Sequence, residues 1–186
     1  MVTKSANYDK IKDIIEYGHI HFGENRIQDA SKKWIPIQKN FLDIKLHFIG
    51  RLQTNKVDEA VSLFSYIHSL ESEKLAVSLS KAEKNHNKKI KYFIQINIGR
   101  EQQKSGISIE DAPDFINYCT KILDLDVVGL MCIPPVDQSP VKYFTYLKEI
   151  SEKHNLSELS MGMSSDYKEA LDCGSTYLRI GSAIFK

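Results

Sequence analysis

The sequence of 186 residues is poor in the features that mark several common protein classes. Its three cysteines, Cys119, Cys132 and Cys173, are widely spaced and form no CxxC pair. A disulfide framework or a cysteine-based zinc site is therefore not expected, and a reducing cytoplasm is the expected location. No apolar run reaches the roughly 18 residues of a membrane span. The first ten residues, MVTKSANYDK, contain no apolar signal core.

An excess of charge of one sign is also missing. Lysine and arginine total 25, aspartate and glutamate total 24, and the formal net charge is +1. This balance gives no electrostatic attraction to nucleic acid or to an anionic membrane, so we expect neither as a partner. Hydrophobic residues make up 42% and charged residues 26%, which is typical of a globular domain. Because no linker or low-complexity segment interrupts the chain, we expect residues 1–186 to form a single domain.

What the sequence does contain is a regular alternation of short apolar segments and helical patterns. This alternation implies parallel strands joined by right-handed crossovers. Eight strands favour an α/β fold of the (β/α)8 TIM-barrel type, with an open doubly wound sheet as the alternative. The expected strands are residues 2–3, 19–22, 46–50, 64–70, 91–99, 126–131, 158–161 and 177–181. The expected helices are residues 8–17, 27–38, 54–63, 72–86, 110–123, 140–153 and 165–173.

Polar residues follow several of the expected strands. In parallel α/β folds, ligands bind at the carboxyl ends of the strands. The turns GMSSD at 162–166 and Gly181-Ser182 suit a phosphate, because they offer backbone N–H groups and hydroxyls. Lys4 follows the first expected strand. A desolvated lysine can form a Schiff base with an aldehyde, and the alternative is a solvated lysine near the terminus.

Other readings of reactive residues are weaker. His19 and His21 form an H-x-H pair on one strand, which is one half of a metal site in some barrel hydrolases. No further ligands are evident at later strand ends, so we expect no metal. Cys132 follows a strand without an evident histidine partner, and we expect a plain buried thiol. The motifs GxGxxG, GxxxxGK[ST], HExxH and GxSxG are absent.

Six ordered motifs, spread over nearly the whole chain, resemble those of the pyridoxal-phosphate homeostasis protein family. That family is similar in fold to the N-terminal barrel of alanine racemase. The motifs are HFGENRIQ (21–28), HFIGRLQTNK (47–56), QINIGREQQKSGI (95–107), GLMCIPP (129–135), LSMGMSSDYKEAL (159–171) and YLRIGSAIF (177–185).

The resemblance implies a binding site for pyridoxal 5′-phosphate. It places the cofactor aldimine on Lys4, although Ala6 and Asn7 replace the Lys-Pro that follows this lysine in the family. It places the remaining contacts at strand ends: Asn25 near the ring, Arg179 at the ring nitrogen or the phosphate, and Ser164, Gly181 and Ser182 on the phosphate.

The function implied is storage or delivery of the cofactor in vitamin B6 homeostasis. A permanent cation near the ring nitrogen disfavours ring protonation and weakens the ring as an electron sink. We therefore expect no robust turnover, with a racemase-like enzyme as the alternative and a metal hydrolase as the third reading. We expect a monomer or a weak homodimer. Family members usually carry a helical segment before the lysine strand, and we expect it to be missing here, which leaves a truncated first strand.

Overall fold

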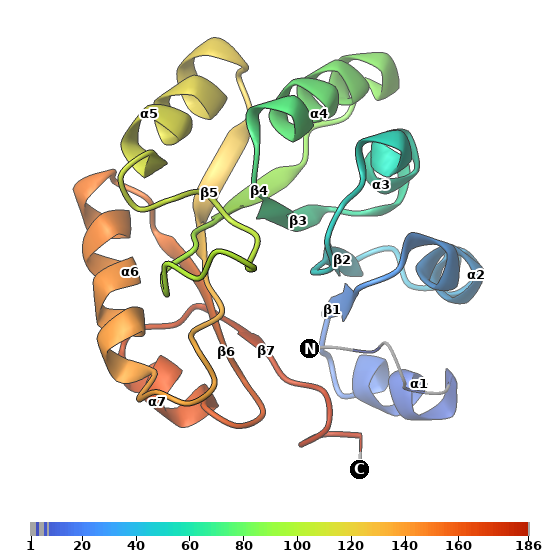
Figure 1. Ribbon diagram of the computed structural model, residues 1–186. Helices are drawn as coiled ribbons and strands as arrows, with labels where there is room; N and C mark the ends of the chain where they lie inside the picture. The colour runs from blue at the N-terminus through green and yellow to red at the C-terminus, as the bar shows by residue number, and fades with distance from the viewer. Residues whose placement is uncertain (1–2, 4–5, 7, 186) are drawn as a thin grey trace.

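The computed structural model describes residues 3, 6 and 8–185. Within these residues, seven parallel strands form one sheet in which each strand pairs with the next along the chain (Figure 1). The order never reverses, so the sheet has no topological switch point and the open doubly wound alternative is wrong. The strands are β1 (His21–Glu24), β2 (Lys45–Phe48), β3 (Tyr66–Leu70), β4 (Lys91–Gln95), β5 (Asp126–Met131), β6 (Glu158–Met163) and β7 (Tyr177–Arg179).

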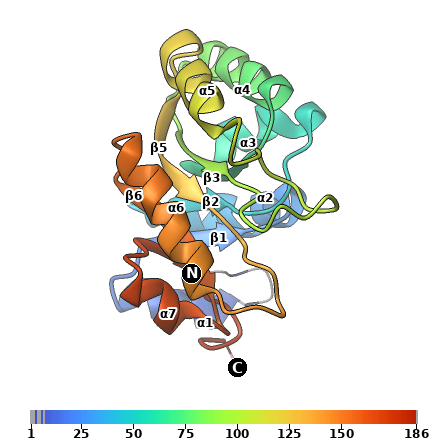
Figure 2. The ribbon, with the colours of Figure 1, turned by 60° about the vertical axis from the view of Figure 1, so that its left-hand side comes forward.

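Helices lie outside the curved sheet, between successive strands, and Figure 2 shows α5, α6 and α7 from the side. Each expected helix is present within a few residues of its expected bounds. The helices are α1 (Tyr8–Glu16), α2 (Ile27–Gln38), α3 (Val57–Leu63), α4 (Glu73–His86), α5 (Ala112–Asn117), α6 (Val141–Lys153) and α7 (Tyr167–Asp172). A 3₁₀ turn, η1 (Thr54–Lys56), precedes α3, and a π-helical turn, η2 (Tyr118–Ile122), follows α5.

The sheet curls into a nearly closed TIM-type barrel, which confirms the expected fold class. Across the gap between the end strands, the Tyr177 ring of β7 lies 5.8 Å from the His21 ring of β1. Thr3, at the place of the expected first strand, donates its backbone N–H to the Gly23 carbonyl at 2.9 Å. The rest of that expected strand, Val2, lies outside the described residues.

Alternation along the strands separates an apolar outer layer from a more polar interior. Leu46 and Phe48 pack outward beneath the helices, whereas His47 between them points into the barrel. The outer layer includes Trp34 of α2, whose ring lies 4.8 Å from that of Phe22. No helix among the described residues is long and apolar enough to cross a membrane.

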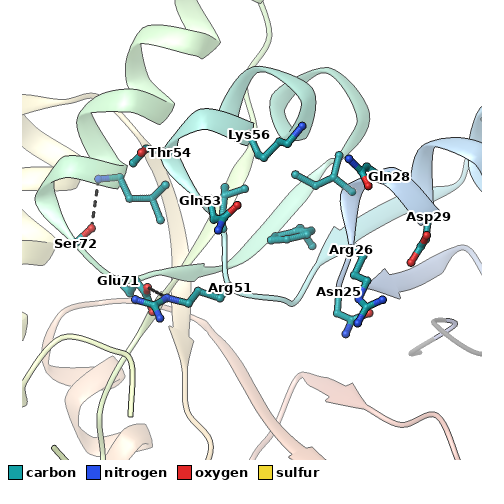
Figure 3. Close-up of a pocket in the computed structure, with 14 residues that line it drawn as sticks. Asn25, Arg26, Gln28, Asp29, Arg51, Gln53, Thr54, Lys56, Glu71 and Ser72 are labelled. Atoms are coloured by element: carbon teal, nitrogen blue, oxygen red, sulfur yellow. Dashed lines mark hydrogen bonds and ion pairs between the residues drawn. The ribbon is translucent and has the colours of Figure 1, made fainter. Parts of the chain in front are cut away.

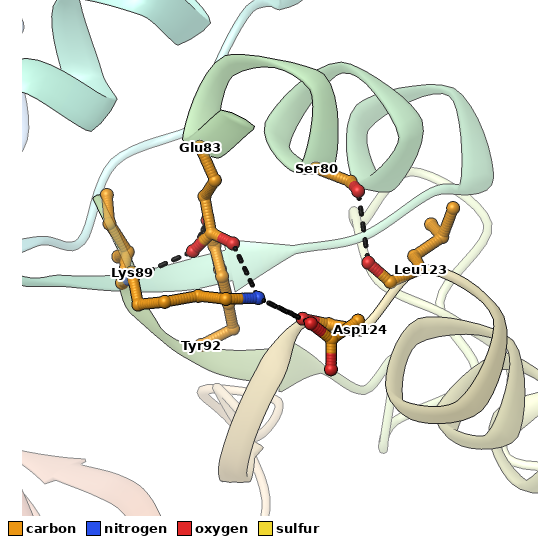
Figure 4. A network of polar contacts seen from close by, with 7 residues as sticks. Ser80, Glu83, Lys89, Tyr92, Leu123 and Asp124 are labelled. Carbon is orange, nitrogen blue, oxygen red and sulfur yellow. Dashed lines mark hydrogen bonds and ion pairs between the residues drawn. The ribbon is translucent and has the colours of Figure 1, made fainter. Parts of the chain in front are cut away.

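A polar network at the amino ends of β4 and β5 ties α4 to the sheet (Figure 4). Glu83 Oε1 accepts hydrogen bonds from the Ile90 backbone N–H at 2.7 Å and from the Tyr92 hydroxyl at 3.1 Å. Lys89 Nζ lies 3.4 Å from Glu83 Oε2 and 2.9 Å from Asp124 Oδ2. Since Glu83 is buried, these donors offset the cost of removing its charge from water.

Of the seven described strands, β5 alone has the bounds expected for it, and the differences in β1, β4 and β7 change which residues follow a strand. β1 begins at His21, where pairing with Lys45 of β2 begins, so Gly23 and Glu24 belong to the strand and do not follow it. β4 ends at Gln95, because Ile96 pairs in an isolated bridge with Ile107. β7 ends at Arg179, two residues earlier than expected.

Candidate functional site

A column of hydrogen-bonded side chains crosses the barrel interior from β1 to β7. His21 Nδ1 lies 2.8 Å from His47 Nε2, and His47 Nδ1 lies 2.9 Å from His68 Nε2. His68 Nδ1 lies 2.7 Å from Ser160 Oγ on β6. Arg179 Nη1 donates to the same hydroxyl at 2.9 Å. We call these five residues the interior column. Its last member, Arg179, lies at the carboxyl end of β7.

The interior column has a defined direction of hydrogen bonding. A neutral imidazole has one N–H, so His47 and His68 each donate one bond and accept one. Arg179 can only donate, which leaves the Ser160 hydroxyl hydrogen available for His68 Nδ1. The bonds then run from Arg179 through Ser160, His68 and His47 to His21, and each of His47 and His68 has its proton on Nε2.

Burial keeps the histidines of the column neutral. It holds the pKa of His47 well below its ordinary value, and the neighbouring His68 and His21 add to this effect. Burial likewise holds the pKa of His68 well below its ordinary value, with the Arg179 cation as the next cause. Burial lowers the pKa of His21 as well. Among the five residues of the interior column, Arg179 is the one that carries a fixed charge.

Arg179 is fixed by three hydrogen bonds at the end of β7. Its Nη1 also donates to the Ser160 carbonyl at 2.7 Å, and its Nη2 donates to the Cys132 carbonyl at 2.9 Å. These bonds join β7 to β6 and to the residue after β5. Burial lowers the pKa of Arg179, yet a guanidinium keeps its charge at neutral pH. Burial raises the pKa of the Cys132 thiol to about 12, so this cysteine is a weak nucleophile.

The turns after β6 and β7 lie next to each other. Met163 pairs with Arg179 in the sheet, so Ser164 and Gly181 follow adjacent strand ends. The first turn is shaped by Gly162, whose φ is +91° and where an added Cβ would lie 2.5 Å from the Ala170 side chain. Asp166 closes this turn by accepting the Met163 N–H.

The Gly181-Ser182 segment forms the second turn. The Gly181 carbonyl accepts from the backbone N–H groups of Ile184 and Phe185, each at 3.0 Å. Ser182 is exposed and Ser164 is partly buried. Both turns therefore present a serine at the same edge of the barrel.

Asn25 lies at the rim of an open polar cleft of about 780 Å³ above β1, β2 and β3 (Figure 3). The cleft is lined by the segment after β1 and by the RLQTNK segment after β2. Gly50 allows the two segments to approach, because an added Cβ there would lie 2.2 Å from the Asn25 carbonyl oxygen. Arg51 Nε donates to Glu71 Oε1 at 3.2 Å across the far side of the cleft.

A second buried cluster surrounds Glu24, the last residue of β1. Glu24 Oε1 accepts from the Thr3 hydroxyl at 2.7 Å, from Lys33 Nζ at 2.9 Å and from the Trp34 indole N–H at 2.9 Å. Lys33 Nζ also donates to the Thr3 carbonyl at 2.6 Å. Lys4, the residue after Thr3, lies outside the described residues.

Comparison with known proteins gives consistent matches over the whole chain. Residues 6–186 match the family model described as alanine racemase, N-terminal domain. A pyridoxal phosphate homeostasis protein of Aquifex aeolicus is 35% identical over 192 residues, which are 98% of this chain and 83% of the relative. One from Synechocystis is 37% identical and is covered over 88% of its length.

This chain belongs to the pyridoxal phosphate homeostasis protein family.

Solved structures agree with this assignment. PipY of Synechococcus elongatus, determined without PLP, superposes on this chain with a TM-score of 0.92 at 30% identity. The superposition includes 100% of this chain and 90% of the PipY chain. PipY with PLP bound gives a TM-score of 0.88 at 29% identity. An alanine racemase of Clostridium difficile gives 0.73 at 12% identity over 50% of its length, which shows a shared fold.

In this chain, the expected cofactor residues fall into two groups. Arg179, Ser164, Gly181 and Ser182 lie on the neighbouring ends of β6 and β7. Asn25 directly follows β1, in which the Gly23 carbonyl accepts the Thr3 backbone N–H.

The histidine pair that was weighed as part of a metal site, and not expected to bind one, has other partners. His21 is bonded to His47 in the interior column, and His19 Nε2 lies 2.6 Å from the His21 carbonyl. Among the described residues, no group of three His, Cys, Asp or Glu side chains is arranged to hold a metal.

Sequence reasoning missed the interior column and the cluster around Glu24. A signal for the column was present, since His21, His47 and His68 lie in three successive strands with apolar neighbours. No local signal distinguishes Lys33 from Lys32, the other lysine of α2.

Proposed function

We propose that this protein binds pyridoxal phosphate, holds it covalently at Lys4 and serves in homeostasis of the cofactor. The amine of Lys4 and the cofactor aldehyde would form a C=N bond with loss of water. The observation that carries the proposal is the fixed guanidinium of Arg179, beside two serine turns, in a chain whose relatives are pyridoxal phosphate homeostasis proteins.

The donor set at the strand ends suits the chemical groups of this cofactor. A phosphate is bound by hydroxyls, backbone N–H groups and cations. Ser164, Gly181 and Ser182 offer such donors on adjacent strand ends, and we propose that they hold the phosphate. PipY, which is 29% identical to this chain, was solved with PLP bound.

We propose that Arg179 lies at the cofactor ring nitrogen or its phosphate and that Asn25 lies near the ring. When bound, pyridoxal phosphate supplies an aldehyde and an electron-withdrawing ring. Arg179 is held in one orientation by Ser160 and Cys132, and its charge is fixed. A fixed cation at the ring nitrogen would keep a proton off that atom, which favours holding the cofactor over stabilising a carbanion.

The test is the visible absorbance of the protein after addition of pyridoxal phosphate. The wild-type protein should develop a band of the lysine adduct, and the Lys4→Ala variant should not. Lys12→Ala is the control, because Lys12 is an exposed lysine of α1. Borohydride reduction followed by peptide mapping should place the label on Lys4. A band of equal intensity in Lys4→Ala would refute the covalent role.

A second measurement separates homeostasis from catalysis. Amino acids incubated with the loaded protein should racemise no faster than with the same concentration of free pyridoxal phosphate. Chiral chromatography measures this directly. A rate well above that of the free cofactor would favour the racemase-like alternative.

A further inference from the structure

Every polar backbone and side-chain group of Thr3 is held by a hydrogen bond. Its backbone N–H donates to the Gly23 carbonyl at 2.9 Å. Its hydroxyl donates to Glu24 Oε1 at 2.7 Å. Its carbonyl accepts from Lys33 Nζ at 2.6 Å and from the Ala6 backbone N–H at 3.1 Å. Thr3 is fully buried, and the side chains of Glu24 and Lys33 hold it in addition to two backbone hydrogen bonds.

Glu24 is the centre of this arrangement. It is 1% exposed, and one of its carboxylate oxygens accepts three hydrogen bonds, from Thr3, Lys33 and Trp34. A buried carboxylate is costly unless it is both paired and hydrogen-bonded, and here it is both. Lys33 reaches it from α2 and bridges the carboxylate and the Thr3 carbonyl. We call Thr3, Glu24, Lys33 and Trp34 the N-terminal clamp.

We propose that Glu24 and Lys33 are positioning residues for the cofactor lysine. The clamp acts through Thr3, which directly precedes Lys4 in the sequence. Because a peptide group is planar, a hydrogen bond to the Thr3 carbonyl fixes the plane of the bond that leads to the next residue. This inference rests on the proposed function, since it concerns the lysine assigned there to the cofactor.

Two features favour this role over simple attachment of α2 to the barrel. Helix α2 already buries Ile27, Ala30, Trp34 and Ile37 against the core, so its packing does not depend on Lys33. The Lys33 ammonium also makes its shorter bond to the Thr3 carbonyl and its longer one to Glu24, at 2.6 Å and 2.9 Å. A cation that served only to neutralise Glu24 would not need to contact the backbone of Thr3.

The experiment compares Lys33→Met with Lys32→Met, its neighbour on the same helix. Both variants replace a lysine by an apolar side chain of similar length, and Lys32 is exposed. Adduct formation is titrated with pyridoxal phosphate, trapped with borohydride and quantified by intact mass. The same variants are titrated by calorimetry with pyridoxine 5′-phosphate, which has the ring and the phosphate but an alcohol where the aldehyde stands. Fluorescence of Trp34, the one tryptophan of the sequence, reports whether the clamp region stays folded.

Lys33→Met should weaken adduct formation by about tenfold, the effect of one lost hydrogen bond to a charged group. Its affinity for pyridoxine 5′-phosphate should change by less than about twofold, because that ligand forms no bond with Lys4. Lys32→Met should match the wild-type protein in both titrations. Equal adduct affinity in the two variants would overturn the proposal, and so would an equal loss for both ligands in Lys33→Met.

A second variant keeps the proposal testable if Lys33→Met fails to fold. Thr3→Val keeps the β-branched shape of a fully buried residue and removes only the hydroxyl bonded to Glu24. It should show the same selective loss of adduct formation, and unchanged adduct formation would overturn the proposal. If the wild-type protein itself forms no Lys4 adduct, the proposed function fails. If the wild-type protein forms the adduct and Lys33→Met forms it equally well, only the positioning role fails.

Discussion

Acid should destabilise this protein through the buried histidines of the interior column. His47 and His68 are neutral in the folded state, and burial holds both pKa values well below the ordinary value. In the unfolded chain, histidine titrates near its ordinary pKa of about 6.5. The unfolded state therefore binds more protons than the folded state below that pH, and stability falls as the pH falls.

The magnitude follows from the number of protons. Each differential proton contributes about 1.4 kcal/mol per pH unit, so His47 and His68 together give a limiting slope of about 2.7 kcal/mol per pH unit below pH ~6. Integrated from pH 7 to pH 5, this amounts to about 4 kcal/mol as long as both rings stay neutral in the folded protein. Such a loss is a large part of the total stability of an ordinary domain, which is about 5–15 kcal/mol.

The assay is urea unfolding at a series of pH values between 7 and 5, a range above that in which most carboxyl groups titrate. The variant His68→Gln keeps a donor and an acceptor but does not titrate, so its limiting slope should be lower than that of the wild-type protein by about 1.4 kcal/mol per pH unit. The reasoning would be refuted by a wild-type slope below about 1.4 kcal/mol per pH unit, which corresponds to one proton, or by an unchanged slope in His68→Gln.

Two substitutions outside the column test other contacts of the barrel. Tyr92→Phe removes one of the donors to Glu83 and leaves the others, so the free energy of unfolding should fall by about 1 kcal/mol in urea titrations. A loss above about 3 kcal/mol would contradict the assumption that the remaining donors still hold Glu83. Gly50→Ala would place a methyl group 2.2 Å from the Asn25 carbonyl oxygen, so the two segments must separate, at a cost of about 2 kcal/mol. An unchanged melting temperature in calorimetry would show that the backbone at Gly50 and the Asn25 carbonyl are not in close contact.

Much of the fold could be predicted from local patterns. Residues 126–131 form β5 as expected, since a run of β-branched and apolar residues between a helix and a turn is typical of a buried parallel strand. The helix over 72–86 begins where Ser72 accepts the Leu75 N–H and ends at Asn87, whose φ is +47°. Capping and hydrophobic spacing are local, so the sequence predicts them well.

The start of β1 depended on a partner strand. The apolar segment HIHF predicted a strand from residue 19, but the pairing of His21 with Lys45 determines where the strand begins. Glu24 consequently lies inside the barrel wall, where it can reach Thr3 and Trp34. A sequence pattern has no information about the register between two strands.

The site was predicted only in part for the same reason. The resemblance named Arg179, but the atoms that fix it belong to Ser160 within β6 and to Cys132 directly after β5. Lys33 was indistinguishable from a solvated lysine of an amphipathic helix. Its role depends on a contact with Thr3, 30 residues earlier in the chain. Contacts between distant segments decide the chemistry of this barrel.

The bond between His68 and Ser160 also sets an order of events during synthesis. The two residues are 92 positions apart, so at about 5–20 residues per second the ribosome needs roughly 5–20 s to deliver Ser160 after His68. During that interval, His68 Nδ1 lacks the Ser160 hydroxyl to which it is bonded in the folded protein. The interior column therefore becomes complete only after β7, which carries Arg179, has been synthesised.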